Sequence, residues 1–149
     1  MKLSIVTINY NNAEGLAKTL KSVLNQTYTA FEHIIVDGAS TDNAVEIIQQ
    51  YEKDATARGV KVVWVSEKDK GIYNAMNKGI KMASGEYIQI LNSGDCLATD
   101  TVVADMYSAL KGKEYPEILY GNMTKVDASG KVIGKSTETP YSFHNYFVS

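Results

Sequence analysis

Polar side chains with the capacity for binding chemistry follow short apolar runs of this sequence. Asp37 closes the apolar run 33–37, and Asp95 comes four residues after the run 86–91. A carboxylate in such a place can accept a hydrogen bond from a ring N–H or a ribose hydroxyl, or it can bind a divalent metal ion. Either acid can equally serve as a turn or cap residue, so the pattern alone leaves both interpretations open.

Lysine and asparagine side chains add further candidates. Lys68 and Lys70 precede a predicted helix, where they can meet phosphates or simply face solvent. Asn77 interrupts an otherwise apolar helical stripe, and it can contact a ligand or cap a neighbouring loop. The polar side chains that end the first apolar run include Thr7, Tyr10 and Asn11.

Glycine-rich phosphate loops are missing from the sequence. It has neither GxxxxGK[ST] nor a GxGxxG after the first apolar run, which argues against P-loop NTPases and nicotinamide dehydrogenases. His33 and His144 lack metal-binding spacing. The single Cys96 can form neither an intrachain disulfide nor a multi-cysteine zinc site.

Apolar periodicity predicts alternating strands and helices that position these residues. Strands are predicted at 3–8, 33–37, 60–66, 86–91 and 118–120, with a hairpin over 125–135. Helical stripes are predicted at 16–24, 44–55, 72–83 and 102–110. Asn11 or Asn12 can cap the first helix, and Gly85 can close the third.

This alternation predicts an α/β fold with a mainly parallel twisted sheet and helices on both faces. In such sheets, ligands bind at the carboxyl ends of the strands. We therefore expect the segments after the first, second and fourth strands to converge on one pocket, with Asp37 and Asp95 on either side of it.

Composition indicates one domain over residues 1–149, since 44% of the residues are hydrophobic and 21% are charged. The formal charge of −2 gives no reason to expect a nucleic-acid partner. No run approaches the ~20 apolar residues that span a bilayer, and the opening apolar run is too short for a secretory signal. We expect a cytoplasmic protein.

Five sequence blocks carry a likeness to a known family. They read SIVTINYN (4–11), LKSVLNQTY (20–28), IIVDGASTD (34–42), EKDKGIYNAMNKG (67–79) and GEYIQILNSGD (85–95). Over about residues 3–121 the chain resembles a family 2 glycosyltransferase with the GT-A, Rossmann-like nucleotide-diphospho-sugar transferase fold. The sequences of its fourth and fifth blocks are similar to those of bacterial colanic-acid-type polysaccharide glycosyltransferases.

The resemblance implies a role for each matching residue. Nucleotide-binding roles fall on Thr7, Tyr10, Asn11, Asp37, Lys70 and Asn77. Within this set Asp37 would bind the base, typically uracil, and Asp95 would hold Mn²⁺ or Mg²⁺. Three departures bear on these roles. Gly38 stands where the family has a second Asp, and Asn92 begins a metal segment that keeps only its last carboxylate. Asn74 stands where related sequences often carry Asp.

The implied activity is metal-dependent, inverting transfer of a sugar from a nucleotide-diphosphate donor, a UDP-sugar, to a saccharide or lipid-linked acceptor in polysaccharide biosynthesis. Peripheral association with the inner membrane face is a further expectation. The family continues well past the length of this chain, so we expect a C-terminally truncated domain. The general base and the acceptor site are then expected beyond Ser149, and this fragment alone is expected to be inactive.

Two other functions stay open at this point. A non-catalytic nucleotide-sugar-binding module would fit the reduced metal segment. A sugar nucleotidyltransferase would share the α/β core but would need a glycine-rich, basic opening loop. The segment from Thr7 to Gly15 has one glycine and no Lys or Arg, which argues against the nucleotidyltransferase.

Overall fold

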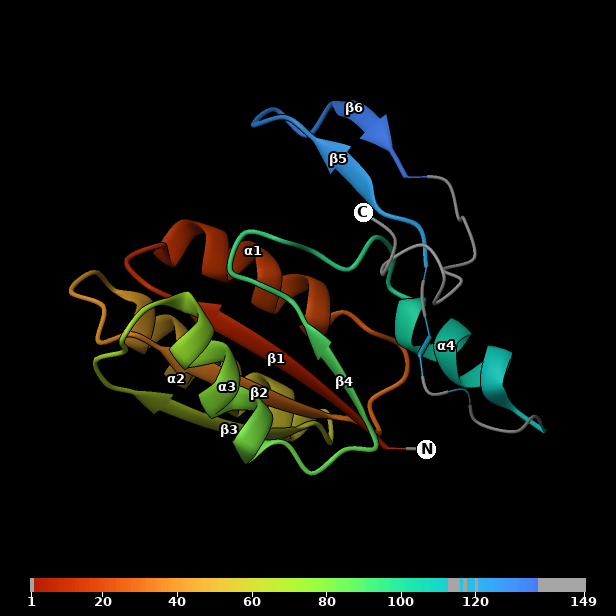
Figure 1. Cartoon of the computed structure of the whole chain (residues 1–149), viewed down its shortest axis with the longest axis horizontal. Helices are drawn as coiled ribbons and strands as arrows, with labels where there is room; N and C mark the ends of the chain where they lie inside the picture. The colour runs from red at the N-terminus through yellow and green to blue at the C-terminus, as the bar shows by residue number, and fades with distance from the viewer. Residues whose placement is uncertain (1, 113–115, 117, 120, 137–149) are drawn as a thin grey trace, which may run out of the picture. The chain divides into compact units, whose positions relative to one another are not determined.

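Figure 1 shows a computed structural model, which describes residues 2–112, 116, 118–119 and 121–136. The chain separates into two compact units, Met1–Lys111 and Gly112–Ser149. The elements of the first unit are β1 (Leu3–Asn9), α1 (Ala13–Leu24), β2 (Glu32–Asp37), α2 (Ala44–Ala57), β3 (Lys61–Ser66), α3 (Ile72–Met82), β4 (Tyr87–Ile90) and α4 (Val102–Leu110). The second unit has β5 (Thr124–Val126) and β6 (Val132–Lys135).

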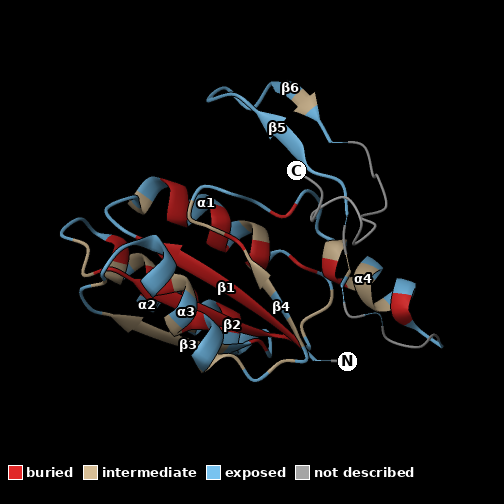
Figure 2. Ribbon diagram, in the orientation of Figure 1, coloured by how far each residue is buried: buried red, intermediate tan, exposed pale blue. Residues whose placement is uncertain are grey.

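The first unit is built on a parallel sheet with the strand order β3-β2-β1-β4. The register places Asn9 at the end of β1 beside Asp37 at the end of β2, and Asp37 beside Ser66 at the end of β3. Figure 2 shows β1 and β2 buried along their length, because they occupy the middle of the sheet. The predicted α/β fold with a mainly parallel sheet is confirmed.

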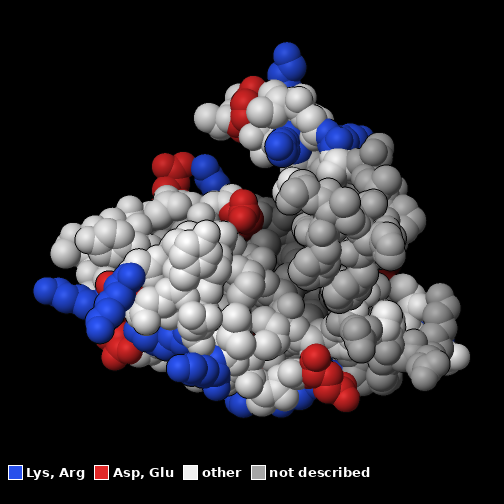
Figure 3. Space-filling view, in the orientation of Figure 1, with Lys and Arg blue, Asp and Glu red and all other residues white. Residues whose placement is uncertain are grey.

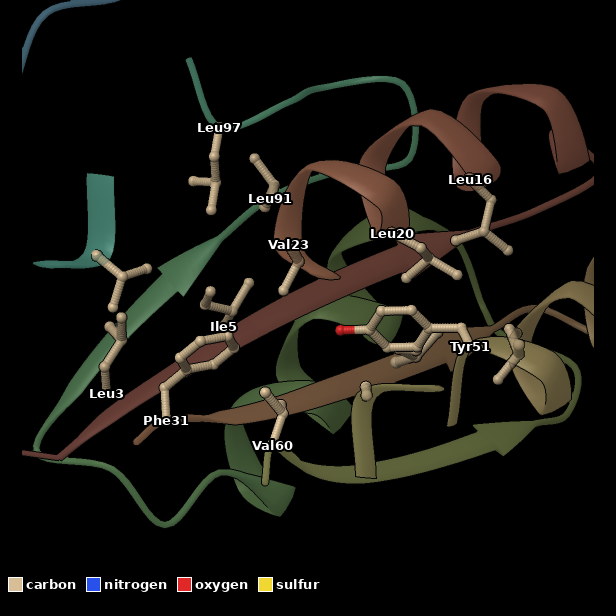
Figure 4. Close-up of a cluster of buried hydrophobic side chains, with 14 of the residues drawn as sticks. Leu3, Ile5, Leu16, Leu20, Val23, Phe31, Tyr51, Val60, Leu91 and Leu97 are labelled. Atoms are coloured by element: carbon tan, nitrogen blue, oxygen red, sulfur yellow. The ribbon is translucent and has the colours of Figure 1, made fainter. Parts of the chain in front are cut away.

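Alternating side chains of the strands divide the core between the two faces of the sheet. On one face, Leu3 and Ile5 pack in a cluster with Leu16, Leu20 and residues of α2 and α4, drawn in part in Figure 4. On the other face, Val6 packs in a second cluster with Ala75 of α3 and other residues. Helices therefore cover both faces, as the sequence predicts.

Close contact between α3 and the sheet depends on a residue without a side chain. A Cβ added at Gly79 would lie 2.4 Å from Cγ1 of Val6, which is closer than two carbon atoms can approach. Gly79 thus lets α3 lie directly on β1. This contact fixes the start of α3 above the carboxyl ends of the strands.

Two local predictions are wrong. Ile118 and Leu119 were expected to form a strand, yet neither pairs with another strand in the described part of the chain, and Ile118 is 66% exposed. The third residue of that expected strand, Tyr120, lies outside the described residues. Gly85 does not cap α3, because the helix ends at Met82 with an extended cap at Ala83. Gly85 instead leaves room for Ser4, whose Oγ would lie 2.5 Å from an added Cβ.

The predicted hairpin is confirmed by the antiparallel pair β5–β6. Among the described residues, no helix is both long enough and apolar enough to cross a bilayer.

Candidate functional site

A cavity of about 670 Å³ opens among the loops that follow β1, β2, β3 and β4, all within the first unit. This volume lies in the range of small-molecule sites. The lining residues are Ile8, Asn9, Tyr10, Asn12, Gly38, Ala39, Thr41, Lys68, Asp69, Gly71, Ile72, Ala75, Asn92 and Ser93. The expected convergence of the loops after the first, second and fourth strands is confirmed, and the loop after β3 joins them.

Charged side chains gather around this end of the sheet. Figure 3 shows Lys and Arg side chains projecting at the left edge, where the loops after β2 and β3 lie, with acidic side chains beside them. The positive charges are thus partly balanced by acids of the same loops.

The loops after β1 and β2 are joined by hydrogen bonds at the cavity edge. Asn11 has a left-handed backbone, with φ of 47°, and its N–H donates to Oγ of Ser40 at 2.8 Å. Its side-chain Oδ1 accepts from the N–H of Thr41 at 2.7 Å. Tyr10, 68% exposed, lines the cavity, whereas Asn11 ties the two loops together without lining it.

Asp37 lies beneath the cavity with no exposed surface. Its Oδ1 accepts from the amide of Asn9 at 2.9 Å and from the hydroxyl of Ser40, and its Oδ2 accepts from the N–H of Ser40 at 3.0 Å and from Oγ of Ser66 at 2.6 Å. Burial alone would raise the pKa of Asp37, but these hydrogen bonds outweigh burial and hold the pKa below its ordinary value. The carboxylate therefore fastens together the ends of β1, β2 and β3.

Thr7 lies outside the cavity lining, and its expected contact with a nucleotide stays a prediction. The side chain is fully buried, and its Oγ1 lies 2.8 Å from Nε2 of His33. Thr7 lies two residues before the cavity-lining Asn9 on the same face of β1, and its hydroxyl is enclosed beside His33 inside the first unit. Nδ1 of His33 in turn lies 2.6 Å from the hydroxyl of Tyr51, which completes a buried polar chain.

The loop after β3 brings an acid to the cavity that the sequence analysis did not select. Asp69 lines the cavity, and its carboxylate is paired with the ammonium of Lys78 on α3. Lys78 also pairs with Glu67 at 2.7 Å, so one cation holds two acids of this loop. The signal for Asp69 was its place between two lysines directly before a helix.

Lys70 and Asn77 are exposed and lie outside the cavity lining. The backbone N–H of Lys70 donates to Oδ1 of Asn74 at 3.2 Å. Lys68, rather than Lys70, is the lysine of this loop that lines the cavity. Contacts of Lys70 and Asn77 with a donor stay predictions.

The loop after β4 provides oxygen atoms at the other edge of the cavity. Asn92 and Ser93 line it, and among the residues that the structure describes, Oδ1 of Asn92 is buried without a hydrogen-bond partner. The backbone carbonyl of Asp95 accepts from Oγ1 of Thr19 at 2.7 Å, which fixes the turn. Among the described residues the carboxylate of Asp95 accepts no hydrogen bond, and the side chain is exposed beyond the cavity lining.

Asn12 and Ser93 line the cavity and link this loop to the one after β1. Oγ of Ser93 donates to Oδ1 of Asn9 at 2.8 Å, and the amide of Asn12 donates to the carbonyl of Ser93 at 3.3 Å. Asn12 also caps α1, since its Oδ1 accepts from the N–H of Gly15. The cavity rim is thus one continuous hydrogen-bonded unit from β3 to β4.

The loop after β4 offers part of the oxygen coordination that a divalent cation needs. Mg²⁺ and Mn²⁺ take hard oxygen ligands, and one or two carboxylates with phosphate oxygens suffice. The loop offers the carboxylate of Asp95 and the unpartnered amide oxygen of Asn92. In the described part of the chain, no group of three or more His, Cys, Asp or Glu side chains is placed to hold a metal by itself. The phosphates of a ligand would have to complete the coordination.

Comparison with known proteins finds relatives among glycosyltransferases and a polysaccharide synthase. Residues 4–147 match the family described as glycosyl transferase family 2. An uncharacterized glycosyltransferase of Mycobacterium tuberculosis is 39% identical over 120 residues, which cover 80% of this chain and 44% of that protein. Poly-beta-1,6-N-acetyl-D-glucosamine synthase of Staphylococcus epidermidis is 32% identical over 145 residues, 94% of this chain and 32% of that protein.

Solved structures share the architecture. S. aureus TarS is 25% identical with a TM-score of 0.63, over 74% of this chain and 19% of that one. A mannosyltransferase of Pyrobaculum calidifontis, in complex with GDP-Man and Mn²⁺, is 22% identical with a TM-score of 0.64, over 73% of this chain and 32% of that one. The chain therefore spans less than half the length of these matched proteins.

Proposed function

The chain belongs to glycosyl transferase family 2, and from this premise we propose that it binds the donor of a glycosyl transfer reaction, a nucleotide-diphosphate sugar. The observation that carries the proposal is the cavity of about 670 Å³ at the carboxyl ends of four parallel strands. A solved neighbour supports the donor class, since one structure of TarS is in complex with UDP-GlcNAc. We propose UDP-sugar as the donor.

The two edges of the cavity suggest how a donor lies in it. The loop after β3 and the loop after β4 stand at opposite ends of the strand order. Three strand spacings of about 4.8 Å separate them, or about 14 Å. We place the nucleoside at Tyr10 and Asp69. We place the diphosphate at Asn92 and Ser93, because the oxygen ligands for a cation lie on the loop after β4.

We propose that Asp95 and Asn92 hold Mn²⁺ or Mg²⁺ together with the donor diphosphate. A bound cation there would neutralise charge on the leaving diphosphate. The hydroxyl of Ser93 donates to Oδ1 of Asn9 and so fixes this loop beside Asn92, which keeps the oxygen ligands in place. An anionic leaving group bound in this way breaks from the sugar more readily, because charge develops against fixed partners.

Transfer itself needs an acceptor and a base. We propose a saccharide or lipid-linked acceptor in polysaccharide synthesis, attack from the face opposite the diphosphate with inversion, and removal of the acceptor's proton by a carboxylate general base. Action at the cytoplasmic side of the membrane, with peripheral association, belongs to the same proposal.

Titration with UDP tests this function. We expect UDP to bind, Mn²⁺ to raise its affinity, and Asp95→Ala to abolish the effect of Mn²⁺ while leaving weaker metal-free binding. Asp100→Ala, which removes an exposed acid of the same connection, is the matched control. UDP binding with no metal effect would favour the non-catalytic module. Turnover of a sugar-1-phosphate with UTP would favour a nucleotidyltransferase.

A further inference from the structure

The connection after β4 is fastened to α1 by polar side chains that follow one another at i, i+3 and i+7. Thr19 contacts the turn 92–95. Oγ of Ser22 accepts from the N–H of Leu97 at 3.1 Å, and the amide of Gln26, two residues past the end of α1, donates to a backbone carbonyl of the same connection at 2.7 Å. Figure 1 shows this connection passing beside α1. The helix therefore acts as the support on which the loop after β4 is laid.

Thr19 holds the turn 92–95 through its backbone. Its Oγ1 donates to the carbonyl of Asp95 at 2.7 Å and accepts from the N–H of Gly94 at 2.9 Å. The carbonyl of Asn92 lies 3.3 Å from the same hydroxyl, and it accepts from the N–H of Asp95 at 2.9 Å, which closes the turn. Thr19 is fully buried, so water does not compete for these contacts. One hydroxyl thus contacts three of the four residues of the turn.

The shape of this turn sets where its oxygen ligands lie. Asn92 and Asp95 are its first and last residues, so its backbone determines how their side chains stand relative to each other. Gly94 has φ of 103°, a conformation that residues with a side chain rarely adopt, and its N–H is the group that Thr19 accepts. Without the hydroxyl of Thr19, the N–H of Gly94 and the carbonyl of Asp95 would lose this partner, and the turn would lose its link to α1.

We propose that Thr19 is a positioning residue for the divalent cation, because it fixes from α1 the turn that carries Asp95 and Asn92. This inference rests on the proposed function, in which these two residues hold the cation with the donor diphosphate. Thr19 lies outside the cavity lining and acts through the turn. Groups that orient metal ligands typically contribute about 10- to 100-fold to metal affinity.

The affinity of Mn²⁺ for the chain saturated with UDP tests this role, and the electron paramagnetic resonance signal of free Mn²⁺ measures it. Thr19→Val keeps the shape of the side chain but removes the hydroxyl, so we expect the affinity for Mn²⁺ to fall by about 10-fold or more. The affinity for UDP without metal should change by less than about 3-fold. Thr19→Ser restores the hydroxyl and should bring the affinity for Mn²⁺ back to within about 3-fold of the unmodified chain.

Ser22→Ala is the matched control, because it removes a hydroxyl of the same helix that holds Leu97, outside the turn. It should keep the full affinity for Mn²⁺. Gly94→Ala perturbs the turn from its exposed side, since a side chain is strained at this φ, and it should weaken Mn²⁺ as Thr19→Val does. This variant keeps the proposal testable if Thr19→Val does not fold.

The proposal is overturned if Thr19→Val or Gly94→Ala retains the affinity for Mn²⁺. It is also overturned if Thr19→Val weakens metal-free UDP binding by the same factor, as general loss of structure would. An unmodified chain that binds UDP with no effect of Mn²⁺, or that does not bind UDP, would contradict the proposed function itself, and with it this inference.

Discussion

Replacing Asp37 with Asn should destabilise the first unit, because this carboxylate holds three strand ends together. Oδ2 accepts from the N–H of Ser40 and from the hydroxyl of Ser66, and Oδ1 accepts from Asn9 and Ser40. An amide keeps the shape but places an NH₂ group where one pair of donors already points. Hydrogen bonds to a charged acceptor contribute roughly 1.5–3 kcal/mol each, so we expect the free energy of unfolding to fall by about 2–4 kcal/mol.

Urea unfolding followed by the fluorescence of Trp64, the single tryptophan, measures this loss. With a slope of about 2 kcal/mol per molar urea, the midpoint should fall by about 1–2 M. Asp54→Asn is the control, since Asp54 is an exposed helix acid that accepts one hydrogen bond from Gln50, and its effect should stay within about 0.5 kcal/mol.

The pH dependence of the difference in free energy of unfolding tests whether the charge of Asp37 causes it. The folded-state pKa of Asp37 lies below its ordinary value of 3.8, so the stabilisation by this carboxylate is present above that pH and is lost as the pH falls below it. The difference between the unmodified chain and Asp37→Asn should therefore shrink in acid. A difference under about 1 kcal/mol at neutral pH, or one that does not change in acid, would refute the reasoning.

Three further perturbations test the packing and the buried titratable groups. Gly79→Ala should lower the free energy of unfolding by about 1–3 kcal/mol, because the new Cβ meets Val6, and urea unfolding at neutral pH measures it. Burial lowers the pKa of His33 to about 3, so stability should fall as the pH drops from 6.5 toward 3, and His33→Gln should flatten this part of the curve. Burial opposes ionisation of Glu32, but hydrogen bonds from Ser4 and Ser84 lower its pKa to about 2, so Glu32→Gln should remove the loss between pH 4.5 and 2.

The sequence predicts the frame of this protein well, since the central strands are continuous apolar runs and the helices have regular apolar stripes. Turn-forming residues also predict the helix cap at Asn12 and the tight turn of the β5–β6 hairpin. The run at Ile118 shows the limit of the method. Three apolar or aromatic residues satisfy the pattern, but a strand also needs a neighbour for its backbone hydrogen bonds, and the pattern carries no information on that neighbour.

The site is predicted in its location and less well in its residues. Parallel strands bring their carboxyl ends to one edge, which is why the loops around Tyr10 and Ser93 meet. Which polar side chain faces the ligand depends on strand alternation and on the donors that reach it from other segments. Thr7 lies deeper along β1 than Asn9 and is buried beside His33, and Asp37 is enclosed by Ser40 and Ser66. Residue type alone predicts neither of these surroundings.

Titration of UDP into the isotope-labelled chain, followed by amide chemical shifts, tests the central claim most directly. We expect the shifts to change at Tyr10, Gly38, Asp69 and Ser93, which line the cavity, and to stay unchanged at the opposite ends of the strands around Glu32. Changes confined to the far end of the sheet, or no change at saturating UDP and Mn²⁺, would contradict the account.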